Sequence, residues 1–283
     1  MTEDGWFVGV DDVDGAARAI RDGRAADPRD WPAAAIAAGY ADDEGDYYRR
    51  LHEAAMVATR EAATEAETAD DRQLVHAVRA LDDVERTANE LAERVAEWGG
   101  GLHGETGVGG VAYAREVADS DPGDDPVERR LVSLAERVVD LDGEAGALRR
   151  FLERRAPTVA PNLSALAGPV LAARLVALAG GLEALAKMPS GTVQVLGAED
   201  ALFAHLRGDA PSPKHGVIYA HEYVHGTRPE DRGSAARAVA GKLSIAARVD
   251  HYSGDRRPEL ETALDERMAR IRSRADDEEE GDA

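Results

Sequence analysis

The stretch QLVHAVRALDDVERTANELAERVAEWGG, residues 73–100, repeats apolar side chains every seven residues. One row contains Leu74, Leu81, Ala88 and Val95, and a second contains Ala77, Val84, Leu91 and Trp98. Two such rows over about three and a half heptads are typical of the a and d positions of a helix that packs against another helix. The glycines after Trp98 predict the end of this helix.

A second pair of rows follows the turn-forming stretch SDPGDDP. One row contains Val127, Leu134, Leu141 and Leu148, and the other contains Leu131, Val138, Ala145 and Leu152. Two heptad helices joined by a connection of roughly 28 residues predict an antiparallel helical hairpin. Ordinary amphipathic core helices would give similar rows, but the unbroken run over four positions favours a coiled coil.

The flanking sequence predicts helices on one side and a mixed module on the other. Residues 163–207 are rich in Ala and Leu, residues 234–250 have a helical pattern, and Leu260, Leu264, Met268 and Ile271 share one helix face. The stretch GWFVGV at 5–10 predicts a short strand, and the terminal DDEEEGDA predicts a disordered acidic tail. We therefore expect a mainly α fold with a small α/β N-terminal module, an antiparallel coiled-coil hairpin and an all-helical C-terminal domain.

The composition narrows the possible functions. The chain has 283 residues, 34 Lys plus Arg against 55 Asp plus Glu, a net charge of −21 and no cysteine, which excludes disulfides and cysteine metal sites. No apolar run reaches the length of a membrane span and the N-terminus is acidic, so we expect a soluble, cytoplasmic protein without a membrane partner. An acidic, Arg-rich chain with few lysines is typical of a halophilic, salt-adapted protein.

The charge is unevenly distributed along the chain. Residues 1–156 contain 19 basic and 36 acidic side chains, whereas residues 157–255 contain nine of each, and five of the eight histidines lie between 205 and 251. If any part of the chain contacts a polyanion, we expect it to be this neutral block.

The stretch YAHEYVHGTR, residues 219–228, contains His221, Glu222 and His225 in the H-E-x-x-H spacing of zinc peptidases. Gly226 follows at once, so any helix is short, and Asp231 stands where an extended motif needs a third histidine. A more distant ligand such as Asp250 remains open. A small zinc-dependent hydrolase is therefore the alternative and not the favoured interpretation.

Residues 161–206 contain the words QVLG and GAEDALF, and residues 213–254 contain AGKLSIAARVD. With these as the most specific words, the two stretches resemble the Nop domain of the archaeal box C/D ribonucleoprotein core protein, a family that includes eukaryotic nucleolar core proteins and a spliceosomal factor. Residues 73–100 also resemble the first coiled-coil helix of that family, so the resemblance covers roughly residues 70–256.

The resemblance implies a scaffold without catalytic residues, metal or cofactor of its own. Its partners would be box C/D guide RNA, the kink-turn-binding ribosomal-type protein, the fibrillarin methyltransferase and a second copy of the chain. Fibrillarin would use S-adenosylmethionine for 2′-O-methylation in rRNA and tRNA processing. The implied segments are a shortened fibrillarin-binding module at 1–50, a coiled coil for dimerisation at 51–156, a Nop domain at 157–256, a C-terminal helix at 257–275 and the tail at 276–283.

Two sets of site residues follow from this interpretation. For RNA or the kink-turn protein we predict Gly197, Ala198, Glu199, Lys214, His221, Arg232, Arg237, Lys242 and Arg248. For dimerisation we predict Leu74, Leu81, Val84, Leu91, Leu134, Leu141 and Leu148. Lys214, Arg232 and Arg237 flank a loop suited to phosphate contacts, and the rings of His221, Tyr223 and His225 are expected to stack on unpaired bases.

Interpretations without an RNA-binding role also fit some of these residues. Asp200, Ala204 and Ser234 replace basic residues that the family usually has, which removes positive charge from the expected RNA face. Arg248 could be a solvated charge, and Glu199 could serve only its own helix start. A helical dimerisation protein without RNA is the third interpretation of the whole chain.

Overall fold

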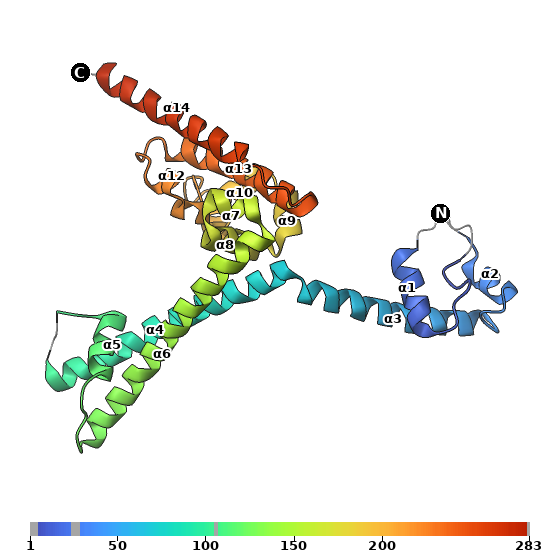
Figure 1. Ribbon diagram of the computed structural model, residues 1–283, viewed down its shortest axis with the longest axis horizontal. Coiled ribbons are helices and arrows are strands. Elements are labelled where there is room, and N and C mark those ends of the chain that lie inside the picture. The colour runs from blue at the N-terminus through green and yellow to red at the C-terminus, as the bar shows by residue number, and fades with distance from the viewer. Residues whose placement is uncertain (1–4, 24–28, 105–106, 282–283) are drawn as a thin grey trace. The chain divides into compact units, whose positions relative to one another are not determined.

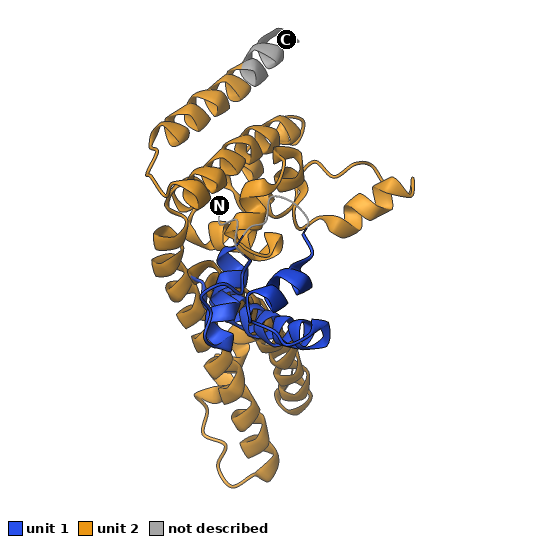
Figure 2. Cartoon of the chain, turned by 90° about the vertical axis from the view of Figure 1, so that its right-hand side faces the viewer, with its two compact units in different colours: residues 1–69 blue, residues 70–283 orange. Residues whose placement is uncertain are grey.

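A computed structural model of the chain describes residues 5–23, 29–104 and 107–281. The chain divides into two compact units, residues 1–69 and residues 70–283, which are coloured separately in Figure 2. The described residues form helices and turns but no strand. The expectation of a mainly α fold is confirmed, and the expected α/β character of the N-terminal module is wrong.

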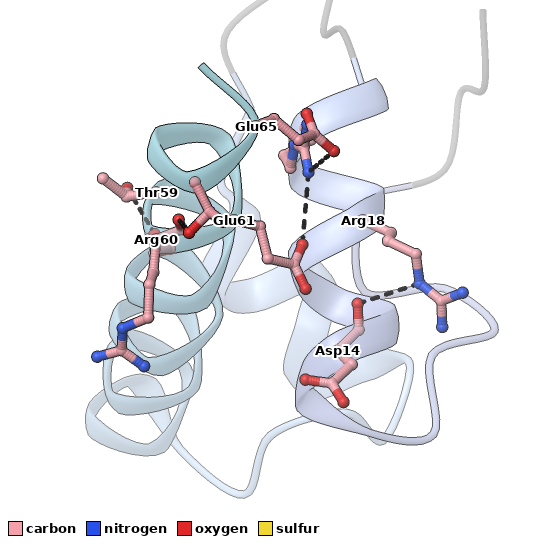
Figure 3. Close-up of polar contacts among 9 residues, drawn as sticks. Asp14, Arg18, Thr59, Arg60, Glu61 and Glu65 are labelled. Carbon is pink, nitrogen blue, oxygen red and sulfur yellow. Dashed lines mark hydrogen bonds and ion pairs between the residues drawn. The ribbon is translucent and has the colours of Figure 1, made fainter. Parts of the chain in front are cut away.

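The first unit contains α1 (Val13–Asp22), α2 (Trp31–Ala37) and α3 (Glu44–Thr68). Small buried residues, among them Ala17 and Ala54, let α1 pack closely against α3. Arg21 of α1 pairs with Glu61 and Glu65 of α3, and Figure 3 shows both glutamates on the side of α3 that faces α1. Ala69 has extended backbone (φ −59°, ψ 146°) and ends α3.

Residues 5–10, the expected strand, form a turn in which the Val8 N–H donates to the Gly5 carbonyl at 3.1 Å. Trp6 and Phe7 both join one aromatic cluster, in which Phe7 stacks on Tyr40 at 5.7 Å. Adjacent side chains of a strand would point to opposite faces, so this cluster requires a turn. Gly9 adopts φ +71°, which a glycine tolerates without strain.

The second unit begins with the hairpin formed by α4 (Asp70–His103) and α6 (Pro126–Val159), which lie side by side in Figure 1. Ion pairs join Asp70 to Arg155 and Glu85 to Arg149, and His103 lies 3.2 Å from Glu128. The partner number falls as the first number rises, so the two helices are antiparallel. The short helix α5 (Gly110–Ala118) packs on both of them near one end.

The heptad leucines are used mainly inside this single chain. Leu74 and Leu81 are fully buried where α4 meets α6, so the core of a single hairpin already uses these side chains predicted to contact a second copy. Val84, Leu91, Leu134 and Leu148 are half-buried and pack against the same hairpin core. Leu141 is half-buried and belongs to no buried apolar cluster among the described residues.

The C-terminal half of this unit surrounds α13 (Arg232–Tyr252). Buried alanines such as Ala236, Ala240 and Ala247 keep the surface of α13 flat, so neighbouring helices approach it closely. These neighbours are α7 (Pro161–Ala167), α9 (Leu182–Lys187), α10 (Ser190–Val195), α12 (Glu222–His225) and α14 (Glu259–Gly281). The remaining elements are α8 (Pro169–Ala179), α11 (Glu199–Leu206) and a 3₁₀ turn, η1 (Val217–Ala220).

Two further expectations concern these helices. No single helix among the described residues is long and apolar enough to cross a membrane; α7 and α8 reach that length only together, and they meet at 117°. Their apolar residues Leu163 and Leu175 are buried in the core. The tail expected to be disordered from residue 276 is instead helical as far as Gly281, where α14 ends, and residues 282–283 lie outside the described part.

Candidate nucleic-acid interface

The segment from Pro213 to Asp231 is the later part of the connection from α11 to α13 and contains η1 and α12. Its start is held by three hydrogen bonds: Gln194 Nε2 donates to the Lys214 carbonyl at 2.8 Å, Gly216 N to the Gln194 carbonyl at 2.9 Å, and Val217 N to the Leu196 carbonyl at 2.8 Å. Ile218 is fully buried just beyond them. The neighbouring side chains are thereby presented to solvent by a fixed backbone.

The exposed face of this segment is a cluster of rings and cations. Tyr219 is 41% exposed and stacks on His215, with ring centroids 4.7 Å apart. Arg232 Cζ lies 5.6 Å from the centre of the Tyr219 ring, and Arg232 Nε donates to the Thr227 carbonyl at 3.0 Å. We call His215, Tyr219, His225 and Arg232 the ring cluster.

The ring cluster has the chemistry needed to recognise unpaired bases and phosphate. Flat side chains on a loop stack on bases, and an adjacent guanidinium contacts phosphate oxygens. Burial, followed by the charge of Arg232, lowers the pKa of His215, so its ring is neutral at neutral pH and can stack without carrying charge. Tyr219 is the central ring, in contact with both His215 and His225, and no motif or spacing in the sequence singles it out.

His221 does not take the role predicted for it. Its side chain is buried (6% exposed), its Nε2–H donates to the Leu166 carbonyl at 2.8 Å, and its Nδ1 accepts from Tyr223 N–H at 3.1 Å. His221 is therefore the N-cap of α12 and cannot stack on a base. Tyr223 is half-buried and donates to Asp265 at 2.7 Å, whereas His225 is exposed as predicted.

The same contacts remove the zinc alternative. A zinc ligand needs a ring nitrogen with a free lone pair, and both nitrogens of His221 are occupied by backbone groups. Among the described residues no three His, Asp or Glu side chains gather at a possible metal position. The H-E-x-x-H spacing arises from an N-cap and an exposed histidine on a four-residue helix.

We expect His221 to make stability fall on acidification. Burial lowers the pKa of His221 from 6.5, so below pH 6.5 the unfolded chain binds a proton that the folded chain does not. The free energy of unfolding, measured by urea titration, should therefore decrease as the pH falls below 6.5. His221→Gln should flatten this pH dependence although it lowers stability at pH 8; a slope as steep as in the wild type contradicts this assignment. The exposed His225 provides the control, His225→Gln.

The start of α11 is bonded to the side chain of its own first residue, Glu199. Gly197 has φ +80°, and its N–H donates to Glu199 Oε1 at 2.8 Å, so Glu199 serves its own helix start. α11 contains no buried residue, and its Phe203 and Leu206 are 58% and 72% exposed. The predicted Gly197–Glu199 site is thus the start of a helix that exposes two large apolar side chains.

The predicted cations of α13 have different surroundings. Arg248 donates from Nε to the Ala186 carbonyl at 3.1 Å and from Nη2 to the Met188 carbonyl at 3.2 Å, so it caps the end of α9 and its predicted RNA role is not supported. Arg237 and Lys242 line one groove. Lys214 is exposed, and its stem lies 3.9 Å from the position that a Cβ would take at Gly233.

Known proteins match most of the chain. Residues 118–273 match the family described as Nop, "snoRNA binding domain, fibrillarin". An uncharacterized NOP5 family protein of Methanocaldococcus jannaschii is 33% identical over 83% of this chain, and nucleolar protein 58 of Schizosaccharomyces pombe is 34% identical over 65% of it. The chain spans 65% and 43% of the lengths of these two relatives.

A solved structure supports the same fold. A chain from the crystal structure of a fibrillarin/Nop5p complex aligns over 94% of this chain and 98% of its own length, with a TM-score of 0.53 and 22% identity. At this identity the match concerns the fold alone.

Proposed function

The chain belongs to the Nop family, and on that premise we propose that it is a non-catalytic scaffold of a box C/D guide ribonucleoprotein. In this role it bridges the guide RNA, the kink-turn-binding protein and fibrillarin, and fibrillarin transfers the methyl group from S-adenosylmethionine to the ribose 2′-OH of rRNA or tRNA. The observation that carries the proposal is the exposed ring cluster, which lies inside the matched region 118–273.

Two exposed surfaces suit two different partners. The ring cluster and Lys214 offer stacking and positive charge to RNA, whereas Phe203 and Leu206 of α11 offer apolar area to the kink-turn protein. The chain is strongly acidic, so its attraction to RNA alone is weak, and it requires the RNA already bound by that protein. The first unit, which α3 extends to Thr68, would be the fibrillarin-binding part.

Self-association is part of the proposal. Leu141 on α6 is a predicted dimerisation residue. It is half-buried and does not belong to the apolar clusters of the hairpin core among the described residues. We place the contact with a second copy on this side of α6, and not on the seam that Leu74 and Leu81 fill.

Tyr219→Ala tests the RNA contact. Stacking on aromatic rings contributes about 1–3 kcal/mol per base, so recruitment to guide RNA carrying the kink-turn protein should weaken roughly 5- to 150-fold, measured by gel shift. Tyr252→Ala is the matched control, because Tyr252 is 69% exposed but lies at the far end of α13. Equal losses in both variants, or recruitment unchanged in Tyr219→Ala, would count against the ring cluster.

A further inference from the structure

A groove of about 340 Å³ lies between α13 and α14. It is lined by Ser234, Arg237, Ala238, Gly241, Lys242 and Ile245 of α13 and by Arg267 of α14. The α13 residues span eleven positions, which corresponds to about 16 Å along a helix. Of the three cations in this lining, Arg237 and Lys242 were predicted from the sequence as site residues, and Arg267 was not.

The groove concentrates positive charge in an acidic protein. Arg237, Lys242 and Arg267 line it and no acidic side chain does, although the chain has 55 acidic and 34 basic residues. Within the described part of the chain none of these three cations forms an ion pair. Three cations that face one groove repel each other, and an anion bound between them would relieve that repulsion.

Arg267 is held beside α13 by a rigid helix. Leu264, Met268 and Ile271 bury the adjoining face of α14 in the core. Tyr223 of α12 donates to Asp265 at 2.7 Å, and the guanidinium of Arg272 lies 5.2 Å from the Tyr223 ring centre. These contacts fix α14 to the segment that carries the ring cluster, so Arg267 can contact a ligand without a rearrangement of the helix.

We infer that this groove binds the sugar–phosphate backbone of RNA, which makes α14 part of the RNA-binding surface. The inference rests on the proposed function and extends it to a second contact region. Ile245 is 41% exposed and, with Ala238 and Gly241, offers an apolar floor on which a ribose can rest between the cations. Ser234, at one end of the groove, lies next to Gly233, which the Lys214 stem approaches, so this end of the groove lies near a further cation.

Arg267→Gln and Arg270→Gln form a matched pair on one helix. Both arginines are exposed, but only Arg267 lines the groove. For binding to guide RNA carrying the kink-turn protein, Arg267→Gln should weaken the Kd about tenfold and reduce the slope of log K against log salt by about 0.7–0.9. Arg270→Gln should leave both quantities close to those of the wild type.

The outcomes separate this inference from the proposed function. If the wild type binds the loaded RNA and Arg267→Gln binds it equally well, the groove is not an RNA-binding site, and the scaffold role is unaffected. Equal weakening by both variants also overturns it, because it indicates diffuse attraction and not a site. Failure of the wild type to bind the loaded RNA overturns the scaffold role, and the groove with it.

A crosslinking experiment identifies the occupant directly. The chain has no cysteine, so Ile245→Cys introduces a single thiol on the groove floor that accepts a photoreactive label. In the assembled complex the label should crosslink to RNA. Crosslinking to the kink-turn protein or to fibrillarin instead would show that the groove is a protein contact.

Discussion

Asp250→Ala should lower the free energy of unfolding of the second unit by roughly 3–5 kcal/mol. The buried carboxylate of Asp250 accepts three hydrogen bonds: from Asn162 N at 3.0 Å, from Asn162 Nδ2 at 2.7 Å and from Leu163 N at 2.8 Å. Removing it leaves the two backbone donors, Asn162 N and Leu163 N, without this partner at the start of α7. Urea unfolding followed by circular dichroism measures the loss.

The network extends beyond these three bonds. Asn162 Oδ1 accepts from Arg257 N at 2.6 Å, and Asn162 Nδ2 also donates to the Asp255 carbonyl at 2.8 Å. The start of α7, the end of α13 and the connection to α14 are thus joined through one buried amide and one buried carboxylate. Local loss of this network should loosen α14 together with α7.

Two variants sharpen the test. Asp250→Asn keeps the shape but turns its amide N–H₂ toward a backbone donor, so it should be destabilised by an intermediate amount. Asp255→Asn is the control, because the Asp255 side chain is exposed. An Asp250→Ala protein that unfolds at the wild-type urea concentration would show that the network is not a source of stability.

The helical hairpin could be predicted because the heptad spacing of its apolar residues is a periodic pattern within each helix. Leu74, Leu81, Leu131 and Val138 recur at heptad spacing, and all four are buried where α4 and α6 meet. The turn at 5–10 could not be predicted in the same way. Six residues suit a strand by composition, and only the tertiary contacts of Trp6 and Phe7 within one cluster select the turn.

The site was harder to predict than the fold, because spacing along a sequence does not determine which side chains are free. Arg248 and Arg237 look alike in the sequence, yet the carbonyls at the end of α9 engage Arg248, while Arg237 faces a groove. His221 was expected at the surface, but its side chain is buried and caps the start of α12. Arg267 could not be selected, since its partners in the groove lie on another helix.

The hydrogen bonds that hold the ring cluster depend on a single glycine. A Cβ at Gly216 would lie 2.0 Å from the Leu196 carbonyl oxygen and 2.7 Å from the carbonyl carbons of Leu196 and Val195. These are backbone atoms, so a side chain at Gly216 cannot be accommodated by a change of rotamer. The segment would have to move away from residues 194–196.

Gly216→Ala should therefore cost about 3 kcal/mol of stability and at least roughly tenfold in recruitment to the loaded guide RNA. Moving the segment breaks the bonds from Gly216 N to Gln194 and from Val217 N to Leu196, and draws Ile218 out of the core. Tyr219 follows Ile218, so the ring cluster loses its position together with the fold of the segment. Gly191→Ala in α10 is the control, since no atom lies within 4 Å of the added methyl group. The hairpin of α4 and α6 has apolar clusters of its own, so it should stay helical in both variants. A Gly216→Ala protein with wild-type stability and recruitment would disprove the assignment.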